Sequence, residues 1–166
     1  MRIRITLCLI FTVSGLAWGQ KFSKQVYLLS DHFSKETCEV DAACDCCASD
    51  LIFLNKRQFA LIDRCLHNDT YLRGTYVIKG EGITLNFRPV VVSQLYDEKT
   101  QNESHEIKRL EMTPLALQVR PCGQNKVTLG HPAINEYKYG SRRKGINEKE
   151  IIRQLKKSKA WKLTST

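Results

Sequence analysis

Five cysteines lie between Cys38 and Cys65, and the second half of this 28-residue stretch has the pattern of a β-hairpin. Two short apolar runs, residues 51–54 and 59–62, flank the polar residues 55–58. Short apolar runs on both sides of a tight polar turn are typical of paired antiparallel strands. The hairpin constrains the fold strongly, because it decides which cysteines of the cluster face a partner strand.

The register of this hairpin predicts a disulfide bond. A turn centred on Lys56 places Phe53 opposite Phe59, with both side chains on one face of the strand pair. The same register, extended along both strands, places Cys47 opposite Cys65 on that face. Cysteines that face each other across neighbouring strands lie within disulfide reach. We therefore predict a Cys47–Cys65 bond, which a register shift of one residue would remove.

The chain begins with the pattern of a cleaved signal peptide. Two arginines in the first four residues precede an apolar run, residues 5–16, and the small residues Ala17 and Gly19 follow. A basic start, a short apolar segment and small residues at its end are what a signal peptidase recognises. Residues 1–19 are therefore predicted to be removed before Gln20, and the rest of the chain to be secreted or periplasmic.

The cysteine count agrees with export. Cleavage removes Cys8 and leaves six cysteines, an even number that fits disulfide bonds in an oxidising compartment. Beyond the predicted bond the pairing stays open, and another cysteine of the cluster is a candidate partner for Cys122. The cysteines with open pairing are Cys38, Cys44, Cys46 and Cys122. Asn68 and Asn102 begin N-glycosylation sequons, which matter only in a eukaryotic host.

Cys44 and Cys47 also have the Cys-x-x-Cys spacing of redox pairs and metal ligands. A redox pair needs a helix start that lowers the thiol pKa, whereas these cysteines precede a strand. The neighbouring carboxylates of Asp41, Asp45 and Asp50 would raise that pKa. A zinc site usually has a second ligand pair with similar spacing, and the sequence has none. Structural disulfides are the favoured interpretation, with redox and metal sites as alternatives.

Residues 20–135 are predicted to form one β domain. Apolar residues mark strands near residues 26–29, 51–54, 59–62, 71–78, 83–87, 90–96, 107–112, 115–119 and 126–129. Residues 97–106 are polar and are predicted to form a loop. Short strands at this even spacing predict a mainly β fold, an antiparallel meander that forms a barrel or half-barrel stapled by disulfides.

The excess positive charge lies in a C-terminal segment, residues 136–166. This segment has ten basic and three acidic residues, whereas residues 20–135 have no net charge. A basic amphipathic helix is predicted over residues 147–163, with Asn147 as N-cap and Glu150 completing a capping-box pattern. Its apolar stripe is expected to pack on the barrel.

The basic side chains of this segment are candidate contacts for an anionic surface. They are Arg142, Arg143, Lys144, Arg153, Lys156, Lys157 and Lys159. An anionic membrane surface or a glycan would suit them. Nucleic acid is disfavoured, because an exported protein seldom meets it and few aromatic residues are interleaved with the basic ones.

No motif of catalysis or cofactor binding is present. None of the four histidines has a metal-binding spacing, and the sequence has no nucleophile elbow, phosphate-binding loop or glycine-rich dinucleotide turn. We therefore assign no catalytic, cofactor-binding or metal-ligating residue and expect no enzyme. No later stretch approaches the roughly 18 apolar residues of a membrane span.

Residues 51–87 resemble the meander of small exported lipocalin-like domains. Phe53 and Phe59 precede Gly-Thr-Tyr at residues 74–76, a glycine-bearing turn and the alternating residues 83–87. In such domains a strand with Gly-x-Tyr runs into a turn and an alternating strand. The resemblance implies a β-barrel that binds a small apolar ligand or a partner and performs no chemistry. It transfers no site residue to this chain.

These patterns favour an exported, non-enzymatic binding module for a small apolar ligand inside the barrel or for an extracytoplasmic protein. The first alternative is an envelope or surface-associated protein whose basic tail contacts anionic polymer or membrane. The second is a small hydrolase or thiol-redox protein. The leading hypothesis requires a contiguous apolar cavity, the first alternative an exposed basic face, and the second a titratable pair in a cleft.

Overall fold

The computed structural model describes residues 22–30, 33–34, 36–40, 48–66, 68–122, 126–130, 139–143 and 145–166. The strands are β1 (Val26–Ser30), β2 (Phe33–Ser34), β3 (Glu39–Val40), β4 (Ala48–Phe53), β5 (Gln58–Cys65), β6 (Asn68–Lys79), β7 (Gly82–Phe87), β8 (Val90–Asp97), β9 (Asn102–Arg109), β10 (Leu115–Cys122), β11 (Lys126–Gly130) and β12 (Tyr139–Arg142). The helices are α2 (Glu148–Lys157) and α3 (Lys159–Leu163).

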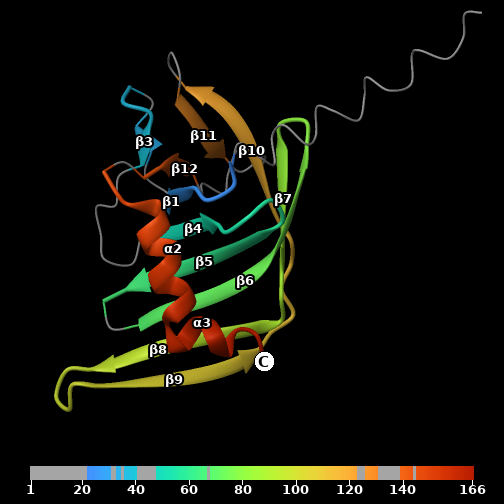
Figure 1. Ribbon diagram of the computed structural model, residues 1–166. Helices are drawn as coiled ribbons and strands as arrows, with labels where there is room; N and C mark the ends of the chain where they lie inside the picture. Colours follow the sequence, from blue (N-terminus) through green and yellow to red (C-terminus); the bar gives the residue numbers. More distant parts are fainter. Residues whose placement is uncertain are drawn as a thin grey trace, which may run out of the picture.

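Eight of the strands form a closed antiparallel barrel (Figure 1). Around the ring they follow the order β5-β4-β1-β12-β11-β10-β7-β6, and pairing of β5 with β6 closes it. The hairpin of β8 and β9 continues the sheet from β6 and lies outside the ring. The mainly β fold predicted from the sequence is confirmed.

The β4–β5 hairpin has the predicted register. Phe53 pairs with Phe59 and Leu51 with Leu61, and all four side chains belong to the inner core of the barrel. Their neighbours along the strands point the other way, because successive side chains in a strand alternate between faces. The register prediction is therefore confirmed over the described part of the hairpin.

The inner core fills the barrel with large side chains. The ring centroids of Phe53 and Tyr76 lie 4.8 Å apart, and those of Phe59 and Phe87 lie 5.2 Å apart. Gly74 faces this core, where a Cβ would lie 2.6 Å from the ring of Phe59. The buried members are Phe22, Tyr27, Leu29, Leu51, Phe53, Phe59, Leu61, Leu72, Tyr76, Ile83, Leu85, Val91, Leu117, Val119 and Leu129.

A second, outer core lies between the barrel wall and the two helices. Leu155 of α2 and Trp161 of α3 pack against the outer face of the wall, and the guanidinium carbon of Arg73 lies 4.6 Å from the centroid of the Trp161 ring. Its buried members are Val26, Ile52, Leu54, Ala60, Ile62, Tyr71, Val90, Val92, Ile152, Leu155, Ala160 and Trp161. Because β4 and β5 are covered on both faces, their sequences read as continuous apolar runs.

The C-terminal helix is interrupted, which differs from the single helix predicted over residues 147–163. Asn147 is the N-cap of α2, and its side chain accepts a hydrogen bond from the Glu150 N–H at 3.2 Å, as predicted. Ser158 has an extended backbone and separates α2 from α3. Its hydroxyl donates to the Leu155 carbonyl and accepts from the Trp161 N–H, so it caps both helices. The break brings Trp161 onto the outer core.

Two other expectations need correction. Residues 102–106, predicted to lie in a polar loop, belong to β9, which is exposed on both faces and therefore needs no apolar alternation. The barrel also extends past the predicted domain end at residue 135, because β12 is its eighth strand. At Gly140 of β12 a Cβ would lie 2.6 Å from the Leu29 side chain, so this strand carries a glycine where the pattern would show an apolar residue.

Candidate functional site

The inner face of the barrel becomes polar at one end, where β5 ends and β6 begins; this end is called the mouth. Ser49 pairs with Asp63, Asp63 with Thr70, and Thr70 with Ser93, so these four residues form one row across β4, β5, β6 and β8. Each lies two residues along its strand from a member of the inner core. Alternation therefore places all four side chains on the inner face. They are called the polar row.

The floor beneath the polar row is apolar. Leu51, Leu61, Leu72 and Val91 lie one step deeper on the same four strands, and their exposed fractions are 6% or less. Above the row, Cys65 pairs with Asn68, which pairs with Leu95 on the other side. The mouth thus carries hydroxyl and carboxylate groups directly over a packed hydrocarbon surface.

The hydrogen bonding within the polar row leaves capacity for a ligand. The Ser49 hydroxyl is buried and donates to the Asp63 carboxylate. Asp63, Thr70 and Ser93 are half-buried. Among the described residues, the Thr70 and Ser93 hydroxyls have no hydrogen-bond partner. A carboxylate and two hydroxyls at this depth can accept from, and donate to, a small polar group.

A change of partner along β6 opens this end of the barrel. Residues 74–79 of β6 pair with β7, whereas residues 68–71 pair with β8. Between the two segments the Arg88 N–H donates to the Arg73 carbonyl at 2.7 Å, and Pro89 follows. Because proline has no N–H to donate, the ladder is interrupted there. β8 and β9 therefore lie outside the ring, and the inner face of β8 extends the mouth.

The outer face of the same wall carries a carboxylate with a different environment. Asp50 is 1% exposed, and its oxygens accept from Arg64 Nε at 2.9 Å and from an Arg143 Nη at 2.9 and 3.1 Å. Burial lowers the pKa of Arg64, but its bond with Asp50 and the carboxylates of Asp50 and Asp69 raise that pKa overall. The cluster ties β4 and β5 to the segment after β12, so we interpret Asp50 as structural.

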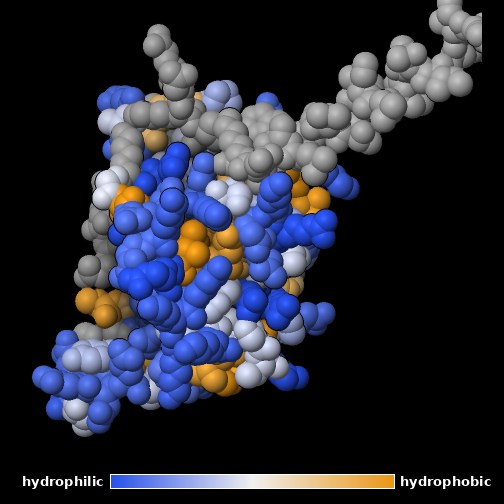
Figure 2. Space-filling model, in the orientation of Figure 1, coloured by the Kyte–Doolittle hydropathy of each residue, from blue (hydrophilic) through white to orange (hydrophobic). Residues whose placement is uncertain are grey.

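A groove lies between α2 and the outer face of β5 and β6. Its volume is about 210 Å³, and its apolar walls come from Ile62, Tyr71, Ile151 and Leu155. Arg64, which lines one side, is engaged by Asp50. Figure 2 shows that the face bearing the helices is mostly hydrophilic, with an apolar patch near its centre.

The predicted anionic-surface residues have different surroundings. Arg142 is paired with Glu148 at 2.9 Å, Arg143 with Asp50, and Arg153 with Glu150. The Glu148 carboxylate raises the pKa of Arg142, and that of Glu150 raises the pKa of Arg153. Of the four lysines in the predicted set, Lys156, Lys157 and Lys159 have exposed side chains. Lys144 lies outside the described residues.

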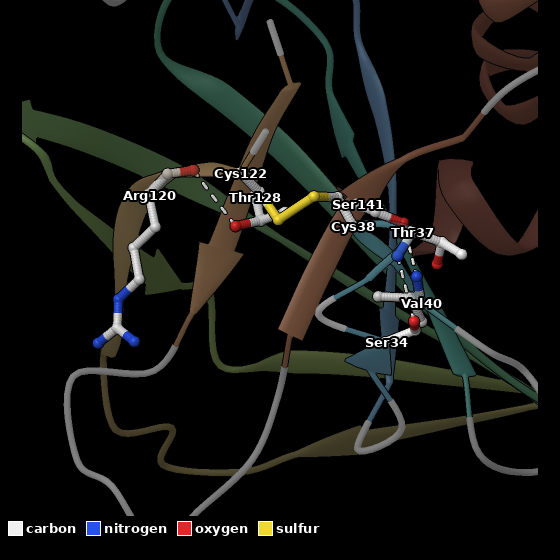
Figure 3. The surroundings of a disulfide bond; sticks show 8 residues. All are labelled: Ser34, Thr37, Cys38, Val40, Arg120, Cys122, Thr128 and Ser141. Carbon is white, nitrogen blue, oxygen red and sulfur yellow. Dashed lines mark hydrogen bonds between the residues drawn. A yellow bond between two sulfur atoms is a disulfide. The ribbon is translucent and has the colours of Figure 1, made fainter. Parts of the chain in front are cut away.

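A disulfide joins Cys38 to Cys122, 84 residues apart, and ties the turn before β3 to the end of β10 (Figure 3). Next to it the Val40 N–H donates to the Ser141 hydroxyl at 3.1 Å, so the same segment also contacts β12. Cys65 is disulfide-bonded as well. The positions of Cys8, Cys44, Cys46 and Cys47 lie outside the described residues, and the Cys47–Cys65 bond stays a prediction.

Within the described residues, no three histidine, cysteine, aspartate or glutamate side chains come together as a metal site would require. His105 lies on β9, and the other three histidines fall outside the described ranges. Neither helix in the described part of the chain is long and apolar enough to cross a membrane.

The sequence alone indicates only part of the polar row. The hairpin register already implied that Ser49 faces Asp63, because it is the register that pairs Phe53 with Phe59. Thr70 joins the row through the β5–β6 hairpin. Ser93 joins it only through the change of partner along β6, which no local sequence pattern indicates. The hairpin could therefore have indicated the first half of the row.

Comparison with known proteins supports the fold alone. No protein-family model matches the chain, and no curated protein matches it. Among solved structures, a streptavidin-like protein from Bacteroides eggerthii aligns with a TM-score of 0.58 at 12% sequence identity, covering 82% of this chain and 90% of that one. The resemblance to lipocalin-like domains accordingly holds as far as a small antiparallel β-barrel, and the fold of this chain is similar to that of a streptavidin-like barrel.

Proposed function

We propose that the chain is an exported, non-enzymatic binding protein that holds a small amphipathic molecule at the mouth of the barrel. The observation that carries this proposal is the polar row, four in-register polar side chains on the inner face above an apolar floor. The polar end of the ligand would bond with Asp63, Thr70 and Ser93. Its apolar part would lie on the floor formed by Leu61, Leu72 and Val91.

The packing of the inner core supports a ligand at the mouth rather than deep inside the barrel. Phe22, Tyr27, Phe53 and Tyr76 form a continuous aromatic cluster with neighbouring ring centroids 4.8 to 5.9 Å apart. Such close-packed rings leave little room for another molecule between them. The sequence-based expectation of an apolar ligand inside the barrel therefore becomes, in this proposal, a ligand above the core.

Export is part of the proposal. The bond between Cys38 and Cys122 fits an oxidising compartment, in which disulfides form and persist. Residues 1–19 would be the signal peptide. N-terminal sequencing of the exported protein tests this directly, and a first residue of Gln20 is expected. A mature protein that still begins at Met1 would contradict it.

The binding site is tested by native mass spectrometry of the protein secreted from a host culture, followed by release and identification of any bound small molecule. Thr70→Val removes a hydroxyl of the polar row with little change in volume, and the same change at Thr75 provides the control. Thr75 lies on β6 as well, but on the outer face and exposed. We expect Thr70→Val and Asp63→Asn to lose the bound molecule and Thr75→Val to keep it. Equal retention by all three variants would contradict the site.

A second candidate function rests on the exposed lysines of the helices. Lys149, Lys156 and Lys157 of α2 and Lys159 and Lys162 of α3 all expose their side chains. An anionic glycan or membrane surface would attract such a set, with a strength that falls as salt rises. This function and the binding site at the mouth do not exclude each other.

Elution from an anionic resin tests the second function. The double variant Lys156→Gln, Lys157→Gln is compared with Lys56→Gln, Lys99→Gln, which removes two exposed lysines from the β4–β5 and β8–β9 turns. Both variants lose the same charge. Earlier elution of the first variant alone would support a contact through α2, and equal elution would refute it.

A further inference from the structure

β9 ends the sheet with one edge open. Among the described residues it pairs only with β8 (Figure 1). Seven of its eight residues are exposed, and His105 is half-buried. An edge strand presents a row of unpaired N–H and C=O groups that can bind another strand. β9 contains no proline, which would block such pairing.

The pairing with β8 determines which groups point outward. The Leu110 N–H donates to the Pro89 carbonyl at 2.8 Å, in the register that continues along the whole hairpin. Hydrogen-bonded and non-hydrogen-bonded pairs alternate along an antiparallel ladder. Lys108 therefore bonds to β8. The residues whose N–H and C=O point to the open edge are Glu103, His105, Ile107 and Arg109.

The charges of β9 are complementary to those of a second β9 that runs the opposite way. Glu103 lies near one end of the strand and Arg109 at the other. A two-fold axis at Glu106 engages all four outward residues and sets each Glu103 opposite the Arg109 of the second copy. His105 then lies opposite Ile107. Each of the four pairs can exchange two backbone hydrogen bonds.

We propose that two copies of this chain associate through antiparallel pairing of their β9 strands. The contact joins the two sheets into one and covers part of the Ile107 side chain, which is 47% exposed in the single chain. Charged side chains usually protect an edge strand against pairing. Here opposite charges at the two ends of the strand favour one partner, a second copy in one register.

One contact in this register is unfavourable. Glu106 lies opposite Glu106 of the second copy, and like charges in facing positions weaken strand pairing. The Lys108 ammonium lies 3.1 Å from the Glu106 carboxylate of the same chain, so it reduces this repulsion. Glu106→Gln is therefore expected to strengthen the dimer, whereas a dimer through any other surface would not respond.

Sedimentation velocity over a range of concentrations tests the proposal. Glu103→Arg and Arg109→Glu are each expected to weaken the dimer about tenfold, because they place like charges opposite each other. The double variant with both changes is expected to restore it. Glu81→Arg, an exposed position in the turn between β6 and β7, is the control for net charge.

His105→Pro provides an independent test. Its N–H points to the open edge, so proline breaks no bond with β8 and should abolish the dimer while the circular dichroism spectrum of the barrel stays unchanged. A protein that remains monomeric at concentrations of several hundred micromolar would overturn the proposal. A dimer that is indifferent to His105→Pro and to the exchange of charges would overturn it equally.

Discussion

Asp50 and Asp63 lie on neighbouring strands of the same barrel wall but on opposite faces, and their surroundings differ. Asp50, on the outer face, is buried and bonded by Arg64 and Arg143. Asp63, on the inner face, is half-buried and accepts from Ser49. The same chemical group thus completes an ion cluster on one face and keeps hydrogen-bonding capacity on the other. The difference separates a structural outer face from an inner face that can bind a ligand at its mouth.

The largest expected effect belongs to the inner face below the mouth. Phe59 is fully buried against Phe87 and Gly74. Phe59→Ala should lower the free energy of unfolding by about 3–5 kcal/mol, because a cavity remains where the ring was. Leu155→Ala in the outer core should cost about 2–3 kcal/mol, since α2 can shift to fill the space. Urea unfolding measures both, and a larger loss for Leu155→Ala would reverse this ranking of the two cores.

The two aspartates should differ in the same measurement. Asp50→Ala leaves two guanidinium groups without their shared acceptor and should cost about 2 kcal/mol. The cost is limited because Arg64 and Arg143 are 51% and 40% exposed and can turn to water. Asp63→Ala should cost less than about 1 kcal/mol, because it loses one bond with Ser49. Equal losses would remove the distinction between the two faces.

Alkaline pH should weaken the inner core. Burial raises the pKa of Tyr76 from 10.0 to about 12 and raises that of Tyr27 as well. The folded state favours the neutral phenol. Its contribution to the free energy of unfolding is therefore complete below pH 10 and is lost between about pH 10 and 12. Near pH 11 ionisation of Tyr76 should lower the free energy of unfolding by about 1 kcal/mol, allowing for screening by solvent. Tyr76→Phe should show a smaller fall in stability between pH 8 and 11, and an unchanged fall would exclude Tyr76 as its source.

The smallest expected effect concerns the start of α2. Asn147→Ala removes the side chain that accepts from the Glu150 N–H and should cost about 0.5–1 kcal/mol. Asn147→Asp, which keeps an acceptor at this position, provides the matched control. In thermal unfolding the alanine variant should have the lowest midpoint temperature. An alanine variant as stable as the aspartate variant would show that this cap does not stabilise the helix.

The sequence was sufficient where strands are apolar and pair locally. The β4–β5 register followed from residues 51–62, since a short turn leaves few ways to align two apolar strands. The cap at Asn147 also followed, because a side chain that accepts from the third residue of a helix is a local feature.

The sequence was insufficient where a strand is exposed or its partner is distant. Residues 102–106 of β9 read as a polar loop, because an edge strand outside the barrel buries neither face. β12 was missed because Gly140 leaves no side chain on its inner face, where Leu29 approaches closely. In the polar row, Ser93 depends on the change of partner along β6, which is set by closure of the barrel and not by the sequence neighbours of Ser93.

The central claim is that the ligand binds on the inner face at the mouth. The most direct test is a titration of the ¹⁵N-labelled protein with the small molecule released from the secreted protein, followed by amide chemical shifts. The account predicts the largest shift changes at Asp63, Thr70 and Ser93, with those of Ile151 and Lys156 on α2 unchanged. Largest changes along α2 would contradict it and would place the ligand in the groove on the outer face.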